Sequence, residues 1–219
     1  MPLRIESRGT PEQQVNYRRS IERVLAGVQR THVGRIVIRH INRSDRTVMI
    51  VPYTGRGVNA AAVPGNNAAS GTFSRTRVAR GTNSRVLFSV DRSVMPDVPQ
   101  GTADEVLLHE LAHALRQING VVRWARDTTG ARVPLRMASF GSVDEFFAAM
   151  VASVHSSELR RPVLGNHGVW ELRNPDVLLQ RPYSTRLRDF WERMPVIAAE
   201  IGAIPANVAA FNPFRDVPH

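Results

Sequence analysis

Residues 102–120 read TADEVLLHELAHALRQING, and we expect the rest of the chain to be arranged around this stretch. Thr102 and Glu105 have the spacing of a capping box, which predicts that a helix begins here. Asn119 and Gly120 are typical of a helix C-terminus. Between these ends lies an apolar stripe that we expect to be buried, made of Val106, Leu107, Leu108, Leu111, Leu115 and Ile118.

His109 and His113 lie four residues apart on this predicted helix, so both imidazoles project from the same face. Two histidines at this spacing can bind one metal ion, and Glu110 completes the HExxH pattern of zinc hydrolases. We expect Glu110 to stay out of the metal's ligand set and to act as a general base toward water. The alternative is a pair of surface histidines on an amphipathic helix, but the flanking residues are apolar on nearly every side.

Composition limits the class of protein. The chain has 219 residues, 42% of them hydrophobic, which fits one sizeable folded unit, and we expect a single domain over residues 1–219. The absence of cysteine excludes a disulfide scaffold. No apolar run has transmembrane length, and Met1–Glu6 lacks the features of a signal peptide. We therefore expect export without such a peptide, or that the chain is one domain of a longer protein.

The net charge of +10 comes mostly from arginines that are spread along the chain. Such a charge favours attraction to acidic surfaces, although arginine stems also cover apolar surface in ordinary basic proteins. With no nucleic-acid-binding motif and few aromatic residues, we expect no specific nucleic-acid partner.

The first hundred residues are predicted to be mostly strands and loop after one helix. That helix is expected over residues 11–26, and strands at 35–41 and 47–53 are expected to form a hairpin. Residues 55–81, rich in Gly, Ala, Asn and Ser, are expected to form a long loop, either over a substrate cleft or as plain surface. The strand at 85–91 is the expected sheet edge for an extended peptide.

The remainder is predicted to be largely helical after the metal-site helix. A small hairpin is expected from residues 121–126 and 131–137, and a second strong helix from 142 to about 159. Further helices are expected at 186–193 and 196–201. These elements indicate an α+β fold whose metal site lies between a strand-rich N-terminal part and a helical C-terminal part.

A catalytic zinc ion usually has three protein ligands, and HExxH supplies two. A third histidine shortly after the motif is absent, because Gly120 is followed by Val121, Val122 and Arg123. A glutamate on the second helix is therefore the expected third ligand.

Two glutamates compete for that role, Glu145 and Glu158. At about 100° per residue, Glu145 shares a helix stripe with small side chains that permit close approach to the histidine helix. Glu158 falls on the bulkier stripe, so helix geometry favours Glu145. Glu145 could instead complete a capping box led by Ser142, and Asp144 is a weaker candidate ligand.

Several segments together resemble gluzincin-type zinc metallopeptidase domains of bacterial secreted effectors. These domains include the C-terminal peptidase extensions of type VI secretion spike proteins and related type III effector peptidases. The matching segments are HELAHALR at 109–116, DEFFA at 144–148, SELRRP at 157–162, NH at 166–167 and NPFR at 212–215. Three positions depart from the family pattern, namely Ser153, His155 and Asn166.

The resemblance implies a zincin-like fold, one zinc ion and hydrolysis of peptide bonds by a secreted or translocated effector. It leaves His167 as the candidate oxyanion stabiliser, with Tyr183 as a further possible donor. The implied partners are a protein substrate in a target cell, a secretion apparatus or parent chain, and an immunity protein. Two alternatives stay open: a metal-stabilised binding domain with little catalysis, and a zinc hydrolase that acts on a non-peptide substrate.

Overall fold

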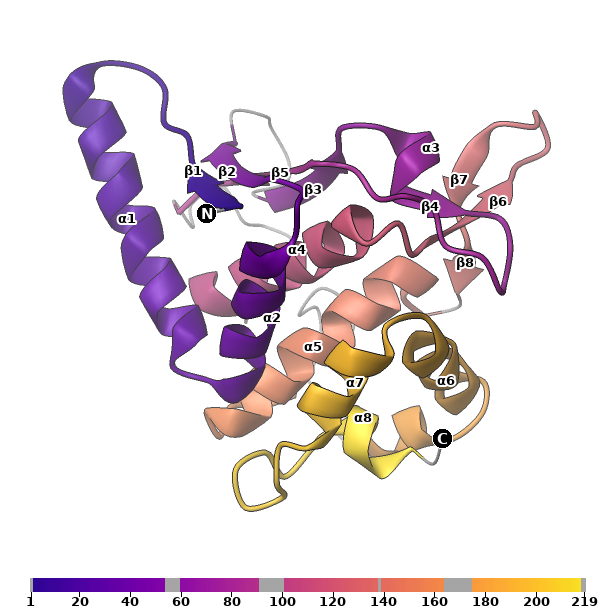
Figure 1. Ribbon diagram of the computed structural model, residues 1–219. Helices are drawn as coiled ribbons and strands as arrows, with labels where there is room; N and C mark the ends of the chain where they lie inside the picture. The colour runs from indigo at the N-terminus through magenta and orange to yellow at the C-terminus, as the bar shows by residue number, and fades with distance from the viewer. Residues whose placement is uncertain (1, 54–59, 91–100, 138, 164–174, 218–219) are drawn as a thin grey trace.

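The computed structural model describes residues 2–53, 60–90, 101–137, 139–163 and 175–217. In this part of the chain helices and small sheets are combined, so the fold is α+β, as predicted. A four-stranded sheet lies on one side of the central helix α4 (Ala103–Ile118), and most other helices lie on the remaining sides (Figure 1).

The four-stranded sheet has the order β1-β2-β5-β3. Its members are β1 (Leu3–Ile5), β2 (Val48–Pro52), β5 (Ser84–Phe88) and β3 (Ala60–Pro64). The first three strands are parallel, and β3 runs antiparallel to β5 with Ala62 opposite Val86. The antiparallel strand β3 therefore forms one edge of the sheet.

The predicted strand at residues 35–41 is wrong, because these residues belong to helix α2 (His32–Arg43). Its run of β-branched residues has the composition of a strand, but the buried side chains recur at helical spacing, at Val33, Val37 and Ile41. Thr31 caps the helix, its hydroxyl oxygen accepting from the Gly34 amide at 3.2 Å. The predicted hairpin is therefore also wrong, and β2 pairs with β1 and β5 instead.

The predicted loop at residues 55–81 is wrong in part, because it contains β3, the short helix α3 (Asn67–Ser70) and β4 (Gly71–Thr72). Residues 73–81 have neither helix nor strand, as predicted, and residues 54–59 lie outside the described part. The strand expected at 85–91 is present as β5, but it lies between β2 and β3 and is not the edge. Strand β3 was not predicted because its sequence, AAAVP, is rich in alanine, which is uncommon in strands.

The other predicted elements are present, with small changes at their ends. The first helix continues past Ala26 to Gln29, and the hairpin expected after α4 forms from two strands that β4 extends on one side. The remaining elements are α1 (Pro11–Gln29), β6 (Val122–Arg126), β7 (Arg132–Pro134), β8 (Arg136–Met137), β9 (Gly141–Ser142), α5 (Val143–Glu158), a 3-10 helix η3 (Pro175–Leu179), α6 (Tyr183–Arg193), α7 (Pro195–Gly202) and α8 (Pro213–Asp216).

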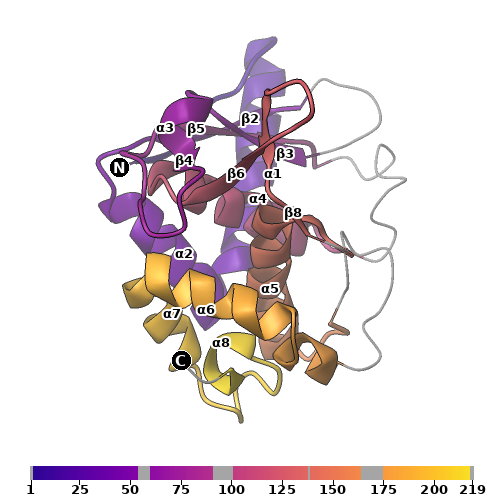
Figure 2. The ribbon, with the colours of Figure 1, turned by 90° about the vertical axis from the view of Figure 1, so that its right-hand side faces the viewer.

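Helix α4 is the centre of the structure. It contacts β3, β5, α1, α2, α3 and α5, and from Glu105 to Ile118 every residue except His109 is buried. The sheet lies above α4 in Figure 1 and α5 lies below it. Figure 2 shows α6, α7 and α8 gathered at the far end, on the side of α5 away from the sheet. Within this span of α4, His109 is therefore the residue that is partly exposed to solvent.

Gly120 ends α4 with a φ of +68°, and a Cβ added there would lie 2.1 Å from the carbonyl oxygen of Ala79. We predict that Gly120→Ala lowers the free energy of unfolding by about 3 kcal/mol, since it adds a backbone clash to the left-handed strain. Gly130→Ala is the matched control, with a φ of +81° and no described atom within 4 Å of the added Cβ. It should cost only about 1 kcal/mol in the same urea titration, and equal losses would contradict the proposed contact.

Candidate metal centre

Three side chains from two helices converge on one point. His109 and His113 come from α4 and Glu145 comes from the first turn of α5. The Nε2 atoms of the two histidines lie 3.1 Å apart, and Glu145 Oε2 lies 3.1 Å from His109 Nε2 and 3.3 Å from His113 Nε2. This group of one carboxylate and two imidazoles could hold a metal ion.

The start of α5 explains how Glu145 reaches the histidines. Its backbone amide donates to Ser142 Oγ at 3.1 Å, as expected for a residue in a capped first turn. The Ser142 amide donates to the carbonyl oxygen of Phe140 at 2.8 Å, so it does not depend on the Glu145 carboxylate. The two roles weighed for Glu145, cap and ligand, are thus divided between its backbone and its side chain.

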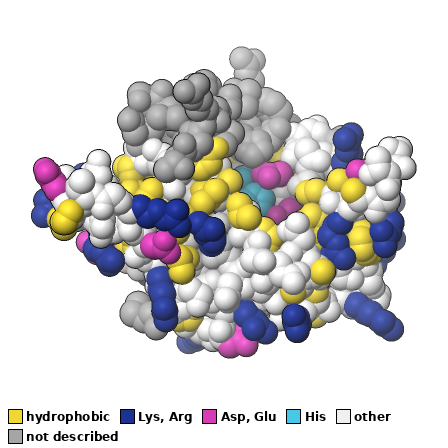
Figure 3. Space-filling model, turned by 90° about the horizontal axis from the view of Figure 1, so that it is seen from above, with side chains coloured by type: hydrophobic (Ala, Val, Ile, Leu, Met, Phe, Trp, Pro, Cys, Tyr) yellow, Lys and Arg dark blue, Asp and Glu magenta, His cyan; other side chains and the backbone are white. Residues whose placement is uncertain are grey.

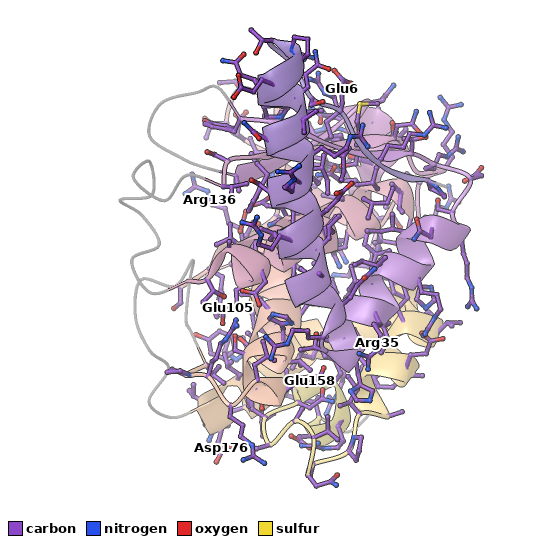
Figure 4. All side chains as sticks on the ribbon, turned by 90° about the vertical axis from the view of Figure 1, so that its left-hand side faces the viewer. Glu6, Arg35, Glu105, Arg136, Glu158 and Asp176 are labelled. Carbon is purple, nitrogen blue, oxygen red and sulfur yellow. The ribbon has the colours of Figure 1, made fainter. Side chains whose placement is uncertain are left out.

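Glu158, the alternative ligand, lies at the other end of α5. Its carboxylate accepts from the amides of His32 at 2.7 Å and Val33 at 2.9 Å, which are the first residues of α2. Figure 4 places it near the end of α1 at which the chain turns into α2, in the neighbourhood of Arg35. Glu158 therefore caps a helix and is not part of the candidate metal group.

Asp144 also lies beside the group, but it contacts a histidine and not the shared point. One carboxylate oxygen is 2.6 Å from His113 Nδ1, and the other pairs with Arg116 Nε. Arg116 is 2% exposed, donates to the carbonyl oxygen of Val121 at 3.2 Å, and covers the ring of Phe147. Because a carboxylate only accepts, Nδ1 carries a proton, and Nε2 is directed at the candidate metal.

This pairing of Arg116, Asp144 and His113 was missed at the level of sequence. Its signal was present: Arg116 follows His113 by three residues on the same helix face, and an acid precedes Glu145. The opposite charges of Arg116 and Asp144 predict an ion pair only once α4 and α5 are known to pack together.

Each charged side chain of the group stabilises the ionised form of its neighbours. Burial alone would lower the pKa of His113, but the carboxylates of Glu145 and Asp144 outweigh it and raise this pKa well above the usual 6.5. Burial alone would raise the pKa of Glu145, but His113 and His109 lower it strongly. A proton on His113 therefore offsets the negative charge of these carboxylates.

Glu110 lies between the histidines and the sheet edge and is 9% exposed. Its carboxylate accepts a hydrogen bond from the backbone of Ala62 in β3, and burial raises its pKa although His113 and His109 act in the opposite direction. The three-residue metal group does not include Glu110, which leaves its carboxylate available for proton transfer.

The group is open to solvent on one side. The side chains of His109 and Glu145 are 12% and 30% exposed, whereas that of His113 is 8% exposed. Seen from above, histidine and acidic side chains lie together between two groups of hydrophobic side chains (Figure 3). A substrate can therefore approach from the side of His109 and Glu145.

Of the two expected oxyanion donors, the structure describes Tyr183 but not His167. His167 and Asn166 lie outside the described residues. His155 is fully buried, with Nδ1 2.8 Å from Thr31 Oγ1 and Nε2 3.2 Å from Asp104, so it ties α5 to the turn before α2. The Tyr183 hydroxyl donates to Ser139 Oγ at 3.4 Å.

Other residues of the resembling segments have structural partners. Ser153 Oγ donates to the Ala149 carbonyl oxygen at 2.8 Å, and Ser157 Oγ accepts from the Phe211 amide at 2.8 Å. Asn212 is fully buried and caps α8. The bond between Ser157 and Phe211 holds the C-terminal segment against α5.

No protein-family model matches the chain, and no curated protein matches it in sequence. Within the described residues, no helix has both the length and the apolar character needed to cross a membrane.

We predict that Glu145→Ala weakens zinc binding at least about 100-fold, because two ligands remain of three. Glu158→Ala is the matched control from the same helix, and it should keep the zinc while losing about 1 to 2 kcal/mol of stability. Metal content after gel filtration and thermal unfolding measure the two effects. Zinc retained in the Glu145 variant and lost in the Glu158 variant would refute the assignment.

We also predict that zinc binding strengthens as the pH rises. The raised pKa of His113 means that its proton stabilises the metal-free fold fully below the ordinary value of 6.5, and that this stabilisation is lost as the pH passes the folded-state pKa. Zinc needs the same Nε2 without its proton. The rise in Tm caused by zinc should therefore grow as the pH increases above 6.5 toward the raised pKa of His113, and a constant rise would contradict this linkage.

Proposed function

We propose that the chain is a zinc-dependent metallopeptidase with a zincin-like fold. The observation that carries the proposal is the spacing of His109 Nε2, His113 Nε2 and Glu145 Oε2, which are 3.1 to 3.3 Å apart. Ligand atoms at about 2.0 to 2.1 Å from a tetrahedral zinc ion are about 3.3 Å from one another. Two imidazoles and one carboxylate are also a donor set that catalytic zinc sites use, with the fourth position left for water or substrate.

A zinc ion held there would lower the pKa of a water molecule and polarise the scissile carbonyl group. Glu110 then takes the proton from the attacking water and delivers it to the leaving amine, acting first as base and then as acid. Its burial supports this role, because a raised pKa makes the carboxylate a stronger base toward the proton of the attacking water.

Two further contacts support a site built for catalysis. Asp144, paired with Arg116, holds His113 in the tautomer whose Nε2 faces the metal. The Ala62 backbone of edge strand β3 holds Glu110, and an extended peptide can add to a free sheet edge. At Ala62 the carbonyl oxygen also accepts from Gln117 Nε2 at 3.0 Å, so we expect a peptide to pair with β3 away from this residue.

The resemblance described above suggests the biological setting. We propose that the protein is a secreted or translocated bacterial effector that cleaves a protein in a target cell. Its partners would then include the delivery apparatus or a parent chain, and an immunity protein in the producing cell.

The test compares the wild-type protein with Glu110→Gln on a target-cell proteome, with mapping of newly formed protein N-termini. We predict that Glu110→Gln lowers cleavage by about 10² to 10⁴-fold, because the general base is lost, while zinc content stays the same. Glu12→Gln, an exposed glutamate of α1, is the control and should cleave like the wild type.

Equal activity of the wild type and Glu110→Gln, with zinc bound to both, would refute the peptidase proposal. Zinc binding without any new termini would favour a metal-stabilised binding domain. Hydrolysis of esters or non-peptide amides, again without new termini, would favour the other zinc hydrolase alternative.

A further inference from the structure

A second charged site lies where α5 contacts β6 and α6, and Arg116 of α4 also lines it. Four arginines line a small hollow there together with Asp189. We call them the arginine cluster: Arg116, Arg123, Arg186 and Arg193. The rings of Phe147 and Phe190 form its apolar wall. The enclosed part of the hollow has room for one water-sized atom.

Two members of the arginine cluster have guanidinium nitrogens without a hydrogen-bond partner. Arg123 is only 5% exposed, yet its buried Nε and Nη1 atoms find no acceptor among the described residues. The buried Nε and Nη2 atoms of Arg193 also find no acceptor among the described residues. Its Nη1 atom donates to the carbonyl oxygens of Ser74 and Arg75. Buried donors without acceptors are costly, and a fully buried cation is more so.

The carboxylates around the hollow do not neutralise it. Asp144 pairs with Arg116, and Asp189 is shared, lying 3.1 Å from Arg186 Nη1 and 3.9 Å from Arg123 Nη1. Four guanidinium groups thus face two carboxylates, and the nearby Arg75 and Glu192 oppose each other in charge. The arginine cluster therefore has an excess of positive charge in an apolar setting.

The same excess is visible in the pKa values. Burial lowers the pKa of Arg123, and Arg186, Arg75 and Arg116 lower it further against the attraction of Asp189. Burial also lowers the pKa of Arg193 to about 10, with Arg116 and Arg123 acting in the same direction. Both groups stay protonated at neutral pH, so the structure keeps unneutralised cations close together.

We propose that the arginine cluster is a binding site for an oxyanion, namely a phosphate group. The planar guanidinium groups of Arg123 and Arg193 offer the pairs of donors that phosphate oxygens accept. One oxygen fills the enclosed part of the hollow, and Arg186, whose side chain is 28% exposed, contacts the group from the outer side. This site does not depend on the peptidase proposal, because it needs neither zinc nor Glu110.

The test measures thermal unfolding of the full chain while sodium phosphate replaces sodium chloride at constant ionic strength. We expect a saturable rise in Tm of about 5 to 10 °C at a hundredfold excess over Kd. Isothermal titration calorimetry with inorganic phosphate gives the Kd directly. Phenyl phosphate is the second probe: binding of inorganic phosphate alone assigns the site to the free ion, and binding of both assigns it to the phosphate group of a larger molecule.

The Arg123→Met variant tests whether Arg123 binds phosphate or only stabilises the fold. Without phosphate, its Tm should equal or exceed that of the wild type, because a buried cation with two unsatisfied hydrogen-bond donors is removed. The phosphate-dependent rise should be lost. Arg126→Met, on the same strand but exposed and stacked on Phe73, should keep the full rise.

An equal rise in Tm with chloride at the same ionic strength would overturn the proposal, as would a full phosphate response in Arg123→Met. If Arg123→Met fails to fold, Arg193→Met provides the same comparison. Absence of heat on titration of the wild type with phosphate would also overturn it.

Discussion

The structure depends on one constraint, which is that a helix with many polar side chains is buried along nearly its whole length. Five buried side chains of α4 need partners: Glu105, Glu110, His113, Arg116 and Gln117. Their partners lie on three neighbours: α5 for Glu105, His113 and Arg116, β5 for Gln117, and β3 for Glu110. Because an unpaired buried polar group costs about 1 to 3 kcal/mol, these pairs determine where the neighbours can lie.

The candidate metal centre follows from that constraint. The helix pair that buries Arg116 against Asp144 also brings Glu145 to the two histidines, since Asp144 and Glu145 are consecutive residues of α5. The sheet edge that satisfies Gln117 also holds Glu110. On α5, Asp144 has a structural contact and its neighbour Glu145 belongs to the candidate metal group. The packing that satisfies the polar side chains of α4 therefore also positions the site.

Much of the candidate site could be predicted from sequence because its signals are local. The capping box and HExxH spacing lie within α4, and Glu145 is distinguished by the small residues on its stripe. Elements whose identity depends on distant partners were missed. Helix α2 has strand-like composition, and β3 is stable as an edge only because β5 and α4 lie beside it. The Arg116–Asp144 pair likewise joins two segments whose packing no single stretch specifies.

The burial of α4 also bears on how such a protein can diverge. A substitution on this helix alters a contact with some other element, so it survives only when the neighbour changes too. Exposed segments are free of this coupling, for example residues 127–130 at the tip of the β6–β7 hairpin and the outer face of α1. We expect sequences descended from a common ancestor to differ mostly there, while the residues of α4 and their partners change together or not at all.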